Sequence, residues 1–304
     1  MARQAVSRGH AGDAGPSCQN ACRMQVFETP GSMREWSDGR RRSGDRVAFV
    51  PTMGALHAGH RHLIETAHGH GDVVVVSVFV NRLQFNVGAD FDAYPRPLDA
   101  DLDACRAAGV HAVYAPTAAA MYPPGFQTHV EPGPLAEALE GAGRPGHFRG
   151  VTTVVTKLFN AVRPHVALFG QKDFQQLVVI GRMVRDLDMG IEIVAVPTVR
   201  EADGLALSSR NTRLDAAARA AAVCVPRSLD ALQAAFYSGE RRADRLEAAA
   251  AAVVGAEPLA RLEYVSVADV ETLQPVSQVE RASVAATAVW FGEVRLIDNL
   301  LLDP

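Results

Sequence analysis

Apolar and polar positions follow two alternating patterns over the first two thirds of the chain. Short, almost wholly apolar runs predict strands at 47–50, 73–80, 111–115, 166–169 and 191–196. Between them, apolar residues at helical spacing predict helices at 60–69, 98–108, 150–162 and 173–187. Strands that are apolar on both sides require helices on both faces of their sheet. The alternation therefore predicts an α/β fold with a doubly wound parallel sheet.

The pattern changes near residue 198. Two alanine-rich helical stretches, 214–237 and 240–254, lead to three strand patterns, "LEYVSVAD", "SVAATAVWF" and "VRLIDNL". We therefore expect an α/β domain over 24–198 and a smaller C-terminal α+β domain over 199–304 that acts as a lid. Residues 1–23 show no apolar periodicity, and we interpret them as a flexible leader or as a mis-annotated start ahead of Met24.

Composition excludes several classes of protein. The formal net charge of the 304 residues is −4, and no basic block of the kind that binds nucleic acid is present. No apolar run is long enough to span a bilayer, so we expect no membrane partner. The four cysteines, Cys18, Cys22, Cys105 and Cys224, show neither the spacing of a zinc site nor a disulfide framework. These features predict a cytoplasmic protein.

Lysine is rare in this chain. Arginine occurs 28 times and lysine twice, at 157 and 172. Genome base composition explains the excess of arginine, but a retained lysine indicates a place where a compact ammonium group is required. Lys157 lies in the middle of a predicted helix and is interpreted as a structural or surface residue, with a phosphate contact as the alternative. Lys172 lies where a strand ends and a helix begins, which favours a functional role.

The segment 141–146, "GAGRPG", has the glycine spacing of a dinucleotide-binding loop without its context. A helix-like segment precedes it instead of a strand, Pro145 interrupts it, and no acidic residue occurs from 150 to 172. Neither lysine is preceded by the glycines of a P-loop. The sequence therefore argues against a Rossmann dehydrogenase and against a P-loop nucleoside triphosphatase.

The stretch "PTMGALHAGHRHLIETA", 51–67, predicts an anion site. It follows the apolar run Val47–Val50, and ligands of open α/β sheets bind at the carboxyl ends of strands. Gly59 allows the backbone to approach a ligand, and the helix that follows offers free N–H groups. His57 and His60 share one face there and could donate hydrogen bonds to phosphate oxygens. Ordinary surface or loop histidines are the alternative.

Three further polar clusters follow predicted strands. In "FGQKDFQQ", 169–176, Lys172 would bind a polyphosphate, Asp173 would cap the helix and Gln176 would hold a small polar substrate. The loop "LALSSRN", 205–211, offers two hydroxyls and a guanidinium to phosphate and could close over a nucleotide. Gln84 follows the strand 73–80. Each cluster alone could be a capped helix or a polar loop, but four at the ends of parallel strands indicate one shared site.

Taken together, these motifs resemble the pantoate–β-alanine ligase family. The resemblance rests on "PTMGALHAGH", "FVN-x-x-QF", "DAYPR", "FGQKDFQQ", "PTVREADGLALSSRN" and "RLIDN", in the family's order from about 24 to 300. It implies a Rossmann-like nucleotidyltransferase domain that binds nucleotide and pantoate. It also implies two half-reactions: ATP and pantoate give pantoyl adenylate and pyrophosphate, and β-alanine then releases AMP and pantothenate. Mg²⁺ bound with the ATP phosphates and a homodimer are implied as well.

The resemblance assigns roles to individual residues. Lys172 and His57 would be catalytic together with His60, the proton donor, although transition-state hydrogen bonding explains the same position. Gln84 and Gln176 would bind pantoate, and Gln84 also β-alanine. Seventeen residues would contact ATP: Met53, Gly54, Ala55, Leu56, His57, Ala58, Gly59, His60, Gly170, Gln171, Lys172, Asp173, Val199, Leu207, Ser208, Ser209 and Arg210.

The chain departs from the family at one place near these residues. Asn81-Arg82-Leu83-Gln84-Phe85 stands where the family usually has Asn-Pro-Met-Gln-Phe, so a proline that would fix the backbone is absent and a charge is added. Two other hypotheses remain open from the residues themselves: a nucleotidyltransferase with a different acid or phosphate acceptor, and a nucleotide-binding protein without catalytic activity.

Overall fold

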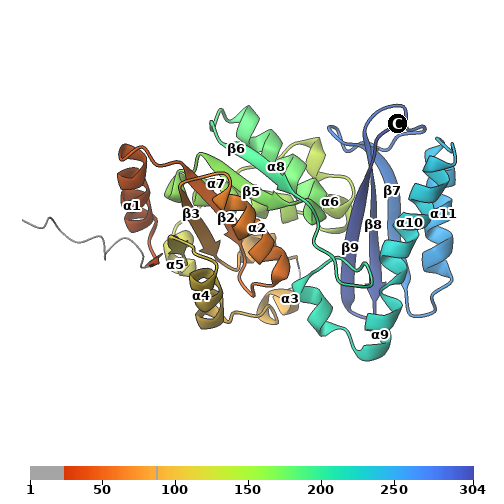
Figure 1. The fold of residues 1–304 in the computed structure, drawn as a ribbon, viewed down its shortest axis with the longest axis horizontal. Coiled ribbons are helices and arrows are strands. Elements are labelled where there is room, and N and C mark those ends of the chain that lie inside the picture. The colour runs from red at the N-terminus through yellow and green to blue at the C-terminus, as the bar shows by residue number, and fades with distance from the viewer. Residues whose placement is uncertain (1–23, 87) are drawn as a thin grey trace, which may run out of the picture.

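The computed structural model of the protein describes residues 24–86 and 88–304. The expected leader, 1–23, lies outside the described residues. Two sheets organise this part of the chain, one parallel and one antiparallel (Figure 1).

The parallel sheet has six strands: β1 (Gln25–Phe27), β2 (Val47–Thr52), β3 (Val73–Val78), β4 (Ala112–Tyr114), β5 (Val166–Gly170) and β6 (Glu192–Val196). Their order is β1-β4-β3-β2-β5-β6, and every pair is parallel. The direction of winding reverses between β2 and β5, which are direct neighbours. Such a switch point leaves a crevice beyond the carboxyl ends of the two strands, where ligands bind.

Helices cover both faces of this sheet. On one face, Ala48 and Val50 of β2 pack with Ile64 of α2 (Ala58–His68) and Cys105 of α4 (Leu98–Ala107). On the other face, Phe49 packs among residues of three further helices, α1 (Pro30–Arg42), α7 (His147–Val162) and α8 (Phe174–Asp186). The predicted doubly wound α/β fold is confirmed.

The predicted helices and strands of this domain are present, with ends shifted by up to three residues. Two elements were not predicted from the sequence: β1, a three-residue edge strand, and α1, which buries only Met33 and Ser37 and so has no apolar stripe. Short elements were not predicted either: α3 (Gly88–Asp92), α5 (Ala118–Met121), α6 (Glu140–Gly143) and the 3₁₀ turns Arg82–Gln84, Pro134–Ala136, Gln171–Asp173 and Ser209–Arg213.

The antiparallel sheet is formed by β7 (Arg261–Asp269), β8 (Ser283–Phe291) and β9 (Val294–Leu302), with β8 in the middle. The helices that precede it are α9 (Ala216–Ala221), α10 (Cys224–Tyr237) and α11 (Ala243–Gly255). The single helix predicted over 214–237 is wrong, because the chain breaks it between α9 and α10. Pro226 explains the break: its ring nitrogen cannot donate to residue 222, so a new helix starts just before it.

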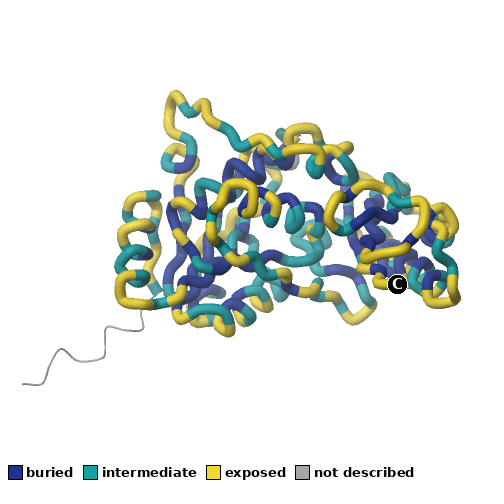
Figure 2. The backbone as a smooth tube through the Cα atoms, turned by 90° about the horizontal axis from the view of Figure 1, so that it is seen from above, coloured by how far each residue is buried: buried dark blue, intermediate teal, exposed yellow. Residues whose placement is uncertain are grey.

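The two sheets are joined by apolar packing. Ala268 and Val284 of the antiparallel sheet pack against Phe174 and Val178 of α8. The most buried stretches of chain include β2, β3, β5 and β8 and the helix α7, and exposed residues lie mainly at the periphery (Figure 2). Among the described residues, no helix has the length and apolar character needed to cross a membrane.

Candidate active site

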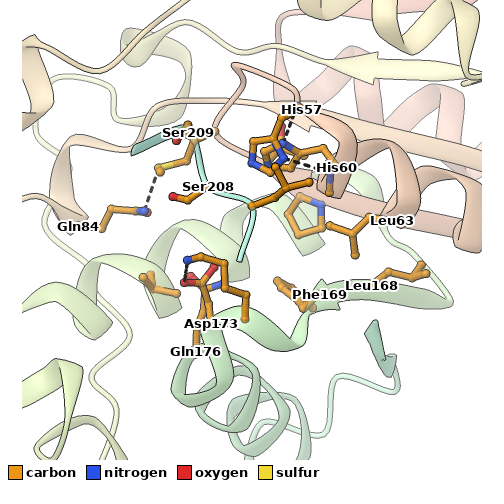
Figure 3. A pocket seen from close by; sticks show the side chains of 18 of the residues that line it. His57, His60, Leu63, Gln84, Leu168, Phe169, Asp173, Gln176, Ser208 and Ser209 are labelled. Atoms are coloured by element: carbon orange, nitrogen blue, oxygen red, sulfur yellow. Dashed lines mark hydrogen bonds and ion pairs between the residues drawn. The ribbon is translucent and has the colours of Figure 1, made fainter. Parts of the chain in front are cut away.

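The carboxyl ends of β2, β3, β5 and β6 open onto one cavity, the main cavity (Figure 3). The predicted convergence of polar clusters is present in the structure. Residues that line it include Met53, His57, Gly59, His60, Gln84, Gly170, Lys172, Asp173, Gln176, Val199, Leu207, Ser208, Ser209 and Arg210. Gly54, Ala55, Leu56, Ala58 and Gln171 belong to the same turns but do not line the cavity.

The turn between β2 and α2 is held in place by Asp101, a residue of α4 that is distant in the sequence. Gly54 and Ala55 have left-handed backbone angles, with φ of +84° and +52°. The buried carboxylate of Asp101 on α4 accepts hydrogen bonds from the amides of Ala55 and Leu56, at 2.9 and 2.8 Å. A β-carbon at Gly54 would lie 2.8 Å from this carboxylate, so glycine is required. The sequence alone does not single out Asp101, because acidic residues in a first helical turn are common.

We expect Asp101→Asn to destabilise this turn. The side-chain NH₂ group of asparagine would face one of the two backbone N–H groups and could not accept its hydrogen bond. Losing a hydrogen bond to a charged acceptor costs about 1.5–3 kcal/mol. The free energy of unfolding should fall by that order in denaturant titrations, and the KM for ATP should rise. Asp103→Asn is the control, since exposed Asp103 on the same helix pairs with Arg106, at 2.6 Å, and not with the turn. Equal effects of the two substitutions would contradict the assignment.

The two histidines form the N-terminal cap of α2. His57 Nδ1 accepts from the amide of Gly59 at 3.1 Å, and His60 Nδ1 accepts from the amide of His57 at 3.2 Å. The ring centroids are 4.1 Å apart. Because each Nδ1 acts as an acceptor, each neutral ring carries its proton on Nε2. The backbone therefore fixes a tautomer that leaves two N–H donors for a ligand.

Both rings are held neutral. Burial, together with the neighbouring His57, lowers the pKa of His60 to about 3. Burial and the ammonium group of Lys172 also lower the pKa of His57. Neither imidazole is therefore protonated at neutral pH in the protein alone, and both act as neutral hydrogen-bond donors. This favours the hydrogen-bonding explanation of His60 over donation of a proton.

Lys172 and Asp173 lie in the 3₁₀ turn between β5 and α8. Lys172 Nζ is 3.4 Å from Asp173 Oδ1. Half of the Asp173 side-chain surface is accessible from the cavity, but the protein around it still desolvates the carboxylate and opposes its charge. Lys172 and Arg210 outweigh this desolvation and lower the pKa of Asp173. The expectation that Asp173 caps α8 through its side chain is wrong. With φ of −95° and ψ of 59° it occupies the cap position, and its side chain forms no capping hydrogen bond.

Gln84 is held by a network that does not need a proline. Its Oε1 accepts from Asn81 Nδ2 and its Nε2 donates to Met53 Sδ, both at 3.0 Å. Asn81 is anchored in turn by the hydroxyl of Tyr122, at 2.8 Å. Asn81 belongs to the motif "FVN-x-x-QF", but no role was predicted for it from the sequence. Asn81 precedes Gln84 by three residues within a turn, and this spacing could have indicated that the two side chains contact each other.

Arg82 does not add its charge to the main cavity. It is exposed, its guanidinium carbon lies 5.1 Å from the centroid of the Phe91 ring, and it donates to the carbonyl of Phe85 at 3.4 Å. The departure from the family pattern is therefore accommodated outside the site.

His147 supports Gln84 from behind. Its Nδ1 donates to the carbonyl of Gln84 at 2.8 Å, and its Nε2 accepts from Arg144 at 3.2 Å. Burial and the Arg144 charge lower the pKa of His147 to about 4.

This shift predicts a pH dependence of stability. Between pH 4 and 6.5 the unfolded chain binds a proton at this residue and the folded chain does not, so acid favours unfolding. The wild type should lose about 3 kcal/mol more unfolding free energy between pH 7 and 4 than His147→Asn, which keeps a donor to Gln84. Parallel pH profiles in denaturant titrations would contradict this prediction.

The segment 207–210 closes the opposite side of the main cavity. Ser208 Oγ accepts from the amide of Arg210 at 3.2 Å and caps the 3₁₀ turn Ser209–Arg213. The Ser209 side chain is hydrogen-bonded to Tyr94, whose pKa is raised by burial. Tyr94 belongs to the motif "DAYPR", for which no role was predicted from the sequence.

Lys157, the other lysine, is placed away from these residues. Its ammonium nitrogen lies 5.9 and 5.1 Å from the ring centroids of Tyr122 and Phe126, and it does not line the main cavity. This position agrees with its interpretation as a structural residue.

Comparison with known proteins covers nearly the whole described chain. A family model described as pantoate-beta-alanine ligase matches residues 25–301. Pantothenate synthetase from Geotalea uraniireducens is 48% identical over 279 residues, 92% of this chain and 99% of the relative. The pantothenate synthetase of Roseiflexus castenholzii is 49% identical over 280 residues, 92% of this chain and 100% of the relative.

Solved structures give the same result. Pantothenate synthetase from Thermus thermophilus has a TM-score of 0.87 and 44% identity, covering 92% of this chain and 100% of that chain. Pantoate-beta-alanine ligase from Francisella tularensis, complexed with beta-gamma ATP and beta-alanine, has a TM-score of 0.74 and 32% identity, covering 92% of this chain and 98% of that chain. The similarity therefore extends over both sheets.

Proposed function

This chain belongs to the pantoate–β-alanine ligase family and is a pantothenate-forming ligase, and we propose that its main cavity performs the reaction in two half-reactions, adenylation and aminolysis. The observation that supports this assignment is the convergence of His57, His60, Lys172 and the segment 207–210 on one cavity at the switch point of the sheet. These groups present the donors and positive charge that a triphosphate requires.

In the first half-reaction a carboxylate oxygen of pantoate attacks the α-phosphorus of ATP. A new P–O bond forms, the bond to the bridging α–β oxygen breaks, and pyrophosphate leaves with the electron pair. We assign the stabilisation of charge on the phosphates to the Nε2–H groups of His57 and His60, the ammonium of Lys172, and Ser208–Arg210. The main role of these residues is to orient the reactants and neutralise charge.

Pantoate is assigned to the part of the main cavity between Gln84 and Gln176. Both residues carry carboxamides, which donate to and accept from hydroxyl and carboxylate oxygens. The apolar side chains of Val151, Val154 and Phe79 line the same cavity and suit the dimethyl carbon of pantoate. This combination distinguishes pantoate from more polar acids.

In the second half-reaction the amine of β-alanine attacks the acyl carbon of the adenylate. A C–N bond forms, the C–O bond to the phosphate breaks, AMP leaves and a proton is released. We place β-alanine beside Gln84, because the acyl group lies there. The bound ATP and β-alanine of the Francisella tularensis relative support this choice of substrates.

Magnesium is proposed as a companion of ATP. Among the described residues no cluster of three or more His, Cys, Asp or Glu side chains could hold a metal ion. The half-exposed carboxylate of Asp173 at the phosphate-binding turn fits an ion held mainly by phosphate oxygens and water. When bound, the ion would neutralise charge on the leaving pyrophosphate.

A homodimer and a cytoplasmic location complete the proposal. The dimer rests on the family resemblance, and the cytoplasmic location on the absence of a disulfide framework from the sequence. Size measurement of the purified protein in solution tests the dimer.

The assignment of substrates is tested by a coupled AMP assay with each substrate omitted in turn. AMP should form rapidly only with ATP, pantoate, β-alanine and Mg²⁺ together. Pyrophosphate exchange into ATP should require pantoate but not β-alanine. Exchange without pantoate, or AMP formation without β-alanine at the full rate, would contradict the two-step assignment.

A further inference from the structure

The motif "RLIDN", 295–299, has no role in the site described so far. Its last two residues, Asp298 and Asn299, lie on β9 and are buried, with exposed fractions of 2% and 6%. Buried polar side chains of this kind are expected to be hydrogen-bonded. The partners of these two residues are therefore informative.

Asn299 holds the turn that carries Lys172. Its Nδ2 donates to the carbonyl of Gln171 at 3.0 Å and to that of Lys172 at 2.8 Å. Both N–H groups of one carboxamide are thus used on two successive carbonyls. The backbone from which the Lys172 side chain extends is fixed to β9.

Asp298 holds the base of the loop that carries Ser208–Arg210. Its carboxylate pairs with both terminal nitrogens of Arg200, at 2.6 and 3.0 Å. The Arg200 side chain also donates to the carbonyl of Gly204 at 3.0 Å. The backbone of Arg200 pairs with that of Ala206 in a single antiparallel β-bridge. A bidentate pair with a buried carboxylate has little freedom to move.

The two attachments meet within β9, which lies on the side of its sheet that faces the parallel sheet (Figure 1). Asp298 Oδ1 accepts the backbone N–H of Asn299 at 2.8 Å, so the two attachments are also linked. One dipeptide thus fixes two segments that are distant from each other in the sequence and that both line the main cavity.

We propose that Asp298 and Asn299 are positioning residues for adenylation, holding Lys172 and Ser208–Arg210 at the separation that the triphosphate of ATP requires. The inference rests on the proposed roles of those residues in ATP binding. Pyrophosphate has left before aminolysis begins, so a disturbed separation affects the first half-reaction and not the second. The antiparallel sheet therefore contributes to adenylation through β9 without itself touching substrate.

Two substitutions test this proposal in the full-length protein. Asn299→Leu keeps the approximate volume of the side chain and removes both donors, and Asp298→Asn keeps its shape and removes the charge. Pantoate-dependent pyrophosphate exchange should fall on the order of 10- to 100-fold, because small displacements of positioned groups have effects of this size. Aminolysis of pantoyl adenylate supplied together with β-alanine should stay at the wild-type rate.

A double substitution separates positioning from general stability. If Asn299 acts through Lys172, Asn299→Leu should slow exchange little further in a Lys172→Ala background. The control is Asp269→Asn, because Asp269 is a buried carboxylate of the same sheet that pairs with Arg281 at 2.8 Å, and it does not line the main cavity. It should leave the ratio of the two half-reaction rates unchanged.

Equal slowing of both half-reactions, or fully additive effects with Lys172→Ala, would overturn the proposal. Wild-type exchange in Lys172→Ala alone would instead refute the proposed role of Lys172, so the two failures are distinguishable. If Asn299→Leu does not fold, the same double-substitution test is made with Asp298→Asn and Arg210→Ala. Asp298→Asn should then slow pyrophosphate exchange little further in the Arg210→Ala background, and fully additive effects would overturn the proposal.

Discussion

Replacing Lys172 by alanine is expected to slow adenylation on the order of 10²- to 10³-fold, the usual effect of losing one group that stabilises transition-state charge. Lys172 is mostly buried, with 17% of its side chain exposed, and its ammonium pairs with the half-exposed Asp173. The charge that develops on the leaving pyrophosphate would lose a compact cation in the main cavity. Pantoate-dependent pyrophosphate exchange measures this step without interference from β-alanine.

Lys157→Ala is a matched control for this substitution. It removes the other lysine of the chain, whose ammonium lies over the rings of Tyr122 and Phe126 outside the main cavity. Its exchange rate should stay close to that of the wild type, although some stability is lost with the cation–π contacts. Similar rates for the two alanine variants would contradict a specific role for Lys172.

The second large effect is expected at His60. His60→Asn should slow adenylation on the order of 10²- to 10³-fold with little change in stability. The asparagine oxygen can still accept the amide of His57, as Nδ1 does, but nothing replaces the Nε2–H donor. His60→Gln places an amide N–H near the position of Nε2 and should recover part of the lost rate.

The pH dependence distinguishes a neutral donor from a protonated one. Because burial lowers the pKa of His60 to about 3, the free protein holds this ring neutral well below pH 7. The kcat/KM of exchange for ATP, which reports groups of the free enzyme, should not fall between pH 7 and 9 through titration of His60. A fall by tenfold per pH unit that disappears in His60→Gln would show instead that a histidinium donates its proton.

Much of this molecule follows from local sequence signals. Strands such as 73–78 are apolar on both sides, and helices such as 174–186 carry one apolar face, so the parallel sheet and its covering helices are readable. Parallel strands bring their carboxyl ends to one edge. The gathering of His57, Lys172 and Ser208 therefore follows from the fold class itself.

The supporting contacts could not be read in the same way. Asp101 and Asn299 act on backbone groups of segments distant in the sequence, and no local pattern marks which amide or carbonyl a side chain will reach. The helix α1 was not predicted because it buries only two residues and so shows no apolar stripe. Asp173 does not cap α8 with its side chain because its backbone, with φ of −95° and ψ of 59°, lies outside the extended region that a capping residue usually adopts.

The most direct test of the account is a crystal structure of this protein with a non-hydrolysable ATP analogue and pantoate. The account predicts phosphate oxygens within about 3.2 Å of the Nε2 atoms of both histidines, of Lys172 Nζ and of the Ser208–Arg210 segment, with pantoate between the two glutamines. A triphosphate bound away from these groups, with Lys172 and the histidines facing only solvent, would contradict it.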